Sequence, residues 1–276
     1  MARAIERIER DIAVLKVAIQ AIATELQSAY ASYLTTLGQA LGKQLILASY
    51  HLCTQGYAEN FLSLSLNQRQ KLQQGIRKLS QKAGEQLLAY IQREEEEEEE
   101  ENEDAGETQE GESNRKSQIP NPKFFDSSNP IELAQWQQEL EEATQEILKR
   151  VSHNANVLLQ KAGILPKKLP EPILAAAAAV SEASAEVIPG PPNLLNLVIE
   201  IENEQESEDS SLTQIMAINL RLGEIEFADS TLLSERKQIR NILVQLNKLG
   251  REYQKKQREL TVAEAEAAWR ASWFED

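Results

Sequence analysis

Apolar residues near the start of the chain recur at alternating intervals of three and four residues. This spacing aligns them along one side of an α-helix, at the a and d positions of a heptad repeat. The pattern predicts a helix that pairs with another helix, either in the same chain or across a homodimer. Isoleucine at both a and d does not favour a simple two-stranded dimer. The residues of this seam are Ile5, Ile8, Ile12, Leu15, Ile19, Ile22 and Leu26.

The apolar stripe widens after the seam, as expected for a helix in a bundle. No proline occurs before residue 120, so one helix is predicted over residues 3–53. Gly38 and Gly42 with Lys43 superficially resemble a phosphate loop, but the motif is one residue short and Gln44 replaces its Ser or Thr. The two glycines instead predict a close approach by another helix. The wider stripe contains Tyr30, Tyr33, Leu34, Leu37, Leu41, Leu45, Ile46 and Tyr50.

Start and stop signals predict the remaining helices. Ser65 and Gln68 form a capping box before a helix over residues 66–92, which folds back antiparallel on the first. Asn129 and Pro130 begin a helix that ends at Gly163. Apolar spacing predicts a modest helix over 212–227 and a long heptad-patterned helix over 231–270. The expected fold class is all-α, an elongated helical hairpin or bundle with coiled-coil segments.

Two inserts divide this helical chain. Residues 94–112 contain 13 acidic residues, including eight consecutive glutamates, and no basic residue. Composition predicts disorder there and in the Pro/Ala-rich and acidic stretch that ends near residue 211. The expected organisation is an N-terminal hairpin (1–93), an acidic linker (94–128), a helix (129–163), a second linker (164–211) and C-terminal helices that pack with the N-terminal part (212–276).

Composition also restricts the classes of function. The net charge is −15, but the chain outside residues 94–112 holds 31 acidic and 29 basic residues. This balance argues against bulk attraction to nucleic acid or anionic membranes. The most apolar window, Leu45 to Cys53, is short for a membrane span, and the N-terminus lacks a secretory h-region. A cytoplasmic protein without a transmembrane segment is therefore expected.

His51 and Cys53 are the best candidates for chemistry, through a metal or a small ligand. They are two residues apart, so a helix does not place them on one face. His153 is the only other histidine and Cys53 the only cysteine. A structural zinc site needs four such ligands, and a Cys–His nucleophile needs an orienting group that the sequence does not reveal. No catalytic, metal or cofactor-binding residue is therefore assigned.

The end of the chain is the strongest candidate for binding a protein. Trp269, Trp273 and Phe274 gather within six residues of a chain that is 5% aromatic. Such a cluster is typical of an interface anchor, although it could equally cap the end of an intramolecular bundle. The apolar patch over residues 194–201, with Leu194, Leu195 and Leu197, is a second candidate. That patch is compatible with a short helix, a strand or a docking peptide.

The stretch from Ala263 to Trp273, with its alternating alanines and acids before the tryptophans, resembles uncharacterised helical proteins of cyanobacteria. The resemblance covers about the last fifth of the chain and carries no site residue across. It implies only that partners belong to a cyanobacterial cell.

Three hypotheses of function follow. The preferred one is a non-enzymatic helical scaffold, adaptor or assembly factor that acts through protein–protein contacts. The second is a regulator whose poly-Glu tract occupies a basic protein surface. The third is an enzyme that uses His51 and Cys53.

Overall fold

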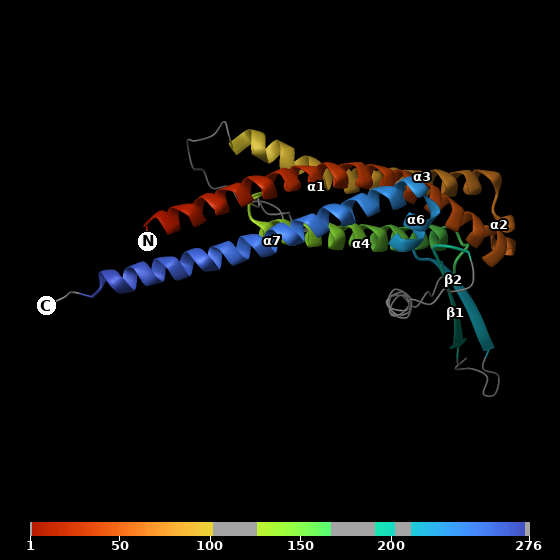
Figure 1. The fold of residues 1–276 in the computed structure, drawn as a ribbon. Coiled ribbons are helices and arrows are strands. Elements are labelled where there is room, and N and C mark those ends of the chain that lie inside the picture. Colours follow the sequence, from red (N-terminus) through yellow and green to blue (C-terminus); the bar gives the residue numbers. More distant parts are fainter. Residues whose placement is uncertain (1, 102–125, 167–190, 202–210, 274–276) are drawn as a thin grey trace, which may run out of the picture. The chain divides into compact units, whose positions relative to one another are not determined.

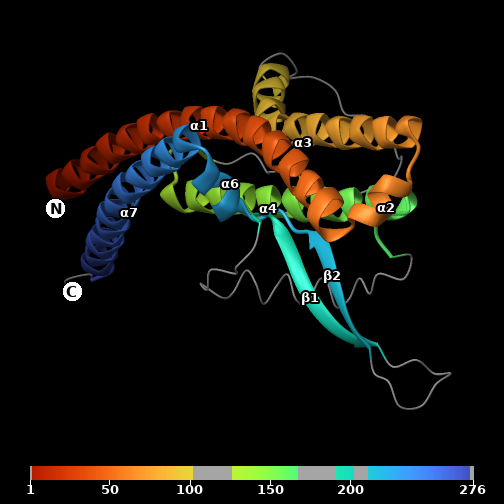
Figure 2. The ribbon, with the colours of Figure 1, turned by 90° about the vertical axis from the view of Figure 1, so that its right-hand side faces the viewer.

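The computed structural model describes residues 2–101, 126–166, 191–201 and 211–273. These residues form helices and one two-stranded antiparallel sheet, so the expected all-α class is confirmed (Figures 1 and 2). The elements are α1 (Ala2–His51), η1 (Leu52–Gly56, a π-helical turn), α2 (Ala58–Ser63), α3 (Leu66–Glu101), α4 (Pro130–Lys161), β1 (Leu194–Ile201), β2 (Ser211–Ile218), α6 (Leu222–Ala228) and α7 (Ser230–Ala271).

The chain divides into two compact units, each assembled from distant segments. Unit 1 comprises Met1–Tyr33, Tyr90–Ala143 and Ser234–Asp276, and unit 2 comprises Leu34–Ala89 and Thr144–Leu233. The long helices α1, α3, α4 and α7 contribute residues to both units.

In unit 1, α1 and α7 pair antiparallel within one chain. Asp11 forms an ion pair with Lys256 at 3.0 Å, and the Ser32 hydroxyl donates a hydrogen bond to the Glu235 carboxylate at 2.6 Å. The residue numbers of each pair add up to 267, which fixes the antiparallel register. Ile12, Ile19 and Leu26 of the predicted seam are buried, whereas Ile5, Ile8, Leu15 and Ile22 are half-buried.

The first part of α4 also belongs to unit 1 and runs antiparallel to α7. A Cβ placed on Gly250 would lie 3.4 Å from Cβ of Pro130, the first residue of α4, and further along Glu141 meets Arg236. Beyond Leu246 the seam of α7 is only half-buried, at Leu249, Tyr253 and Leu260. Burial therefore decreases along α7 past the position where α4 begins.

In unit 2, α1 and α3 form the predicted helical hairpin. A Cβ on Gly38 would lie 3.1 Å from the Cα of Gly84, and one on Gly42 would lie 3.5 Å from the Ser80 hydroxyl oxygen. The two glycines of α1 thus allow close approach of a helix, as predicted. The wide stripe of α1 is buried from Tyr30 to Leu45, but Ile46 and Tyr50 are exposed, contrary to expectation.

Hydrogen bonds at the helix ends match the sequence signals. The backbone N–H of Ser65 donates to Gln68 Oε1 at 2.8 Å, which is half of a capping box. The N–H of Ile131 donates to Asn129 Oδ1 at 3.1 Å, so Asn129 caps α4. At the other end of α4, Gly163 has a φ of +82° and the N–H of Ile164 donates to the Leu159 carbonyl.

The largest difference from expectation is a β-hairpin where a helix was predicted. Residues 211–218 form β2, and only Leu222–Ala228 are helical within the predicted helix 212–227. β2 pairs antiparallel with β1 in the register Leu194↔Ile218, and this answers the open question about the apolar patch. The spacing of apolar residues gave a wrong prediction here, because the backbone N–H and C=O groups of β2 form their hydrogen bonds with β1.

Polar side chains of unit 2 hold the hairpin in place. Asn156 of α4 accepts from the N–H of Ile218 and donates to its carbonyl, both at 2.9 Å, as a neighbouring strand would. The Tyr57 hydroxyl bonds Met216 in the same way, at 3.1 and 3.2 Å. At the base of the hairpin, buried Asn193 has a φ of 59°, a left-handed conformation that asparagine tolerates.

The predicted disordered inserts lie mostly outside the described residues, at 102–125, 167–190 and 202–210. The prediction ended the second helix near residue 92, whereas α3 continues to Glu101. The backbone of the eight consecutive glutamates is therefore part of α3.

By length and composition, one helix among the described residues, Ala4–Gly56, could cross a membrane. Its best 18-residue window has a mean hydropathy of 1.3, and 28% of that window is buried within the protein. Core helices of soluble proteins meet the same criteria, so the absence of a transmembrane segment stays a prediction.

The close approach at Gly38 predicts a selective loss of stability. Gly38→Val would push branched methyl groups into the backbone of α3, and overpacking of this kind destabilises by about 1–3 kcal/mol. Urea unfolding followed by circular dichroism measures the effect. The control is Gly223→Ala, because nothing lies within 4 Å of a Cβ there. An equal unfolding midpoint for Gly38→Val and the control would contradict the tight α1–α3 contact.

Candidate interaction surface

Two tryptophans lie exposed at the end of α7. Trp269 and Trp273 are 66% and 68% exposed, and their rings meet edge to face with centroids 5.9 Å apart. The i, i+4 spacing on a helix places both rings on one side. The hydroxyl of Ser272 donates to the Trp269 carbonyl at 2.7 Å, which closes the last turn. Phe274, the third residue of the predicted anchor, lies outside the described residues.

The register of α1 and α7 explains why these tryptophans stay exposed. With paired residue numbers adding up to 267, Ala2 lies opposite residue 265. The last turns of α7 therefore extend past the first described residue of α1, as Figure 1 shows at the ends marked N and C. Packing against α1 does not cover Trp269 or Trp273. The alternative that they cap an intramolecular bundle finds no support among the described residues.

The second predicted binding segment, residues 194–201, is less exposed than the tryptophans. Leu194 and Leu195 are buried in unit 2, and Leu197 is half-buried. All three belong to β1, which pairs with β2 along its length. Because the first two leucines contribute to the core of unit 2, they are not accessible for docking a partner.

Cys53 lines a groove of unit 2, and His51 is not among its lining residues. Cys53 is buried, and desolvation raises its pKa to about 11, which disfavours the thiolate that a nucleophile or metal ligand requires. The Tyr50 ring lies 5.4 Å from that of His51, centroid to centroid. Among the described residues, no group of three or more His, Cys, Asp or Glu side chains could hold a metal ion.

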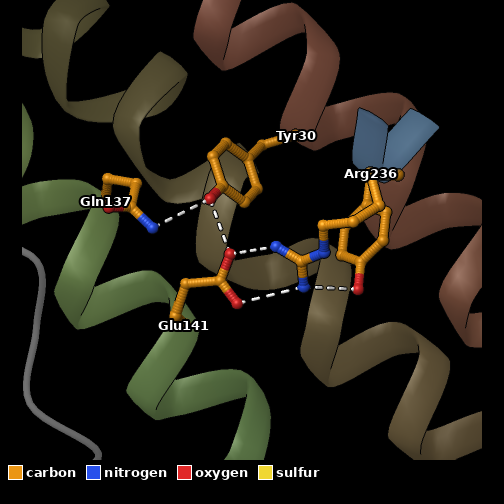
Figure 3. Close-up of polar contacts among 5 residues, drawn as sticks. Tyr30, Gln137, Glu141 and Arg236 are labelled. Carbon is orange, nitrogen blue, oxygen red and sulfur yellow. Dashed lines mark hydrogen bonds and ion pairs between the residues drawn. The ribbon is translucent and has the colours of Figure 1, made fainter. Parts of the chain in front are cut away.

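A buried polar cluster that the sequence analysis missed links α1, α4 and α7 in unit 1 (Figure 3). The Glu141 carboxylate accepts from both terminal nitrogens of Arg236, with Nη2–Oε2 at 3.1 Å, and from the Tyr30 hydroxyl at 2.6 Å. Gln137 donates to the Tyr30 oxygen at 3.1 Å, and Arg236 Nη2 donates to the Tyr33 hydroxyl at 2.7 Å. The guanidinium carbon also lies 4.4 Å from the centroid of the Tyr33 ring.

The cluster is suited to fixing structure. Arg236 and Glu141 are 12% and 22% exposed, and each charge of this bidentate pair is satisfied by the other. Burial, reinforced by the nearby Glu141 carboxylate, raises the pKa of Tyr30 well above its ordinary value, so the phenol remains a proton donor. The Tyr30 ring packs edge to face against Trp136, with centroids 5.7 Å apart. These contacts join three helices in one register.

Comparison of the chain with protein-family models, curated protein sequences and solved structures finds no match. The resemblance to helical cyanobacterial proteins therefore stays a prediction.

The buried pair predicts a large effect from one isosteric substitution. Glu141→Gln leaves the Arg236 charge without its partner, and breaking such a pair costs about 3 kcal/mol. Glu139→Gln, two residues earlier on an exposed position, is the matched control and should change stability by less than about 0.5 kcal/mol. Equilibrium urea unfolding of the full chain measures both. A Glu141→Gln protein as stable as the control would show that the pair does not secure α7.

Proposed function

We propose that this protein is a non-enzymatic helical scaffold or adaptor that recruits a protein partner through the end of α7. The observation that carries the proposal is the exposure of Trp269 and Trp273 beyond the pairing of α7 with α1. Large exposed aromatics of this kind are the residues that most often dominate the free energy of protein–protein binding.

The contacts that anchor α7 support this role. The helix is anchored in unit 1 through Arg236 and Lys256, which bond to α4 and α1 respectively. Its final turns then present two rings whose mutual contact restricts their rotamers. A rigid aromatic pair loses little conformational entropy on binding, so it anchors a partner efficiently.

The interior polar groups of the protein also differ from an enzyme site. The polar cluster of Tyr30, Glu141 and Arg236 is internally satisfied, and burial keeps the Cys53 thiol protonated. Neither arrangement provides an activated nucleophile or an unpaired general base. These properties support a binding role over the alternative of an enzyme that uses His51 and Cys53.

The test is affinity capture from native cell extract with quantitative mass spectrometry. Trp269→Ala/Trp273→Ala should lose a partner that the unaltered protein retains, by at least about 30-fold, because truncating a hot-spot residue costs 2 kcal/mol or more. Phe227→Ala is the matched control, since Phe227 is an 83% exposed aromatic of unit 2.

Circular dichroism and melting temperature must first show that both variants keep the native fold. Retention of every partner by the tryptophan variant would refute the proposed anchor. Capture of only the chain itself would replace the scaffold with a homo-oligomer, which sedimentation velocity would identify.

A further inference from the structure

The outward face of α7 carries a cationic stripe. Its residues follow one another at intervals of three and four, and Val244 occupies the middle of the one eight-residue interval between basic residues. At 100° per residue they fall within an arc of roughly 80°, and the charged part extends about 32 Å along the helix. All are exposed: the stripe consists of Lys237, Arg240, Val244, Lys248, Arg251, Lys255, Arg258 and Val262.

The charges of this cationic stripe are not used within the described part of the chain. None of its six basic residues makes an ion pair with a described residue. Lys256, which lies on the side of α7 that faces α1, differs because it pairs with Asp11 at 3.0 Å and Glu259 at 3.1 Å. The acidic Glu252 and Glu259 flank the stripe without interrupting it. Among the described residues, the stripe therefore presents a one-sided positive field to solvent.

Apolar side chains lie within this stripe. Val244 and Val262 of α7 are 68% and 51% exposed. The line of the stripe continues to Trp269 and Trp273 at the end of α7.

The net charge of −15 does not oppose such a local field. Thirteen of the acidic residues belong to residues 94–112, and the rest of the chain is close to neutral. At physiological ionic strength, exposed charges beyond about 8 Å are largely screened.

We propose that this face of α7, with its exposed Val244 and Val262, binds the surface of an anionic lipid bilayer. The headgroup region offers phosphates to the six cations, and the boundary with the acyl chains accommodates the two valines. A straight face that combines cations with unpartnered apolar side chains fits a bilayer better than an acidic protein helix, which satisfies charges alone. Each basic residue close to an anionic membrane strengthens binding by roughly five-fold.

This inference is separate from the proposed function. The tryptophan pair recruits a protein in that proposal, whereas the stripe and the two valines carry the lipid contact here. A scaffold with both surfaces would assemble its partner at a membrane.

The experiment is cosedimentation of the full chain with vesicles of 30% phosphatidylglycerol in phosphatidylcholine, and with pure phosphatidylcholine. Lys248→Glu/Arg251→Glu/Lys255→Glu/Arg258→Glu reverses the stripe. The control, Lys71→Glu/Arg77→Glu/Lys78→Glu/Lys82→Glu, reverses four exposed cations of α3 and carries the same net charge. Circular dichroism confirms that both variants remain helical.

We expect the unaltered protein and the α3 control to bind anionic vesicles within about five-fold of each other, and neither to bind neutral vesicles. The stripe variant should bind at least 100-fold more weakly, and 0.5 M salt should weaken binding of the unaltered protein similarly. Val244→Ser/Val262→Ser should weaken it several-fold while leaving the salt dependence unchanged. An equal loss in the stripe variant and the α3 control would show that bulk charge is responsible and would overturn the proposal.

The proposal also fails if the unaltered protein binds no vesicles, whether or not the stripe then proves to bind an acidic protein. Trp269→Ala/Trp273→Ala in the same assay separates the two proposals. Loss of protein partners with vesicle binding retained would show that the two surfaces act independently.

Discussion

The antiparallel pairing of α1 with α7 is the constraint on which the surface of this protein depends. The Asp11–Lys256 and Ser32–Glu235 contacts fix its register, and the Arg236–Glu141 pair joins it to α4. Because the ladder of contacts runs along one side of α7, the opposite side is left to solvent. Because the register carries α7 past Ala2, its final turns are also left uncovered. One pairing thus determines both the cationic stripe and the exposed tryptophans.

The burial of the residues between α1 and α7 in unit 1 decreases along this pairing. Near Tyr30 and Arg236, three helices meet around a polar cluster whose charges are mutually satisfied, and such networks favour one register over its neighbours. Further along α7, beyond Leu246, its seam residues are only half-buried. Buried contacts are thereby concentrated at one end of α7, and the exposed tryptophans lie at the other.

Much of this architecture could be predicted from the sequence where the signal is local. Asn129 and Ser65 mark the starts of helices. Gly38 allows the close helix contact that its spacing from Gly42 predicted. Contacts between distant residues were not predictable. Tyr30 and Glu141 are 111 residues apart, and nothing near either reveals the other. Likewise, residues 212–218 have helical spacing, yet pairing with β1 makes them a strand. The tryptophan cluster was evident from the sequence, but its exposure depends on the register of α7.

The central claim, that α7 pairs with α1 of the same chain, is tested most directly by cross-linking. Cysteines replace Asp11 and Lys256 in a Cys53→Ala background, and a short thiol-specific cross-linker is added at low protein concentration. The account predicts a cross-linked monomer, and no cross-link for cysteines at Asp11 and Val244, which lie about 18 Å out of register. A product found only as a covalent dimer, or equal yields for both cysteine pairs, would contradict it.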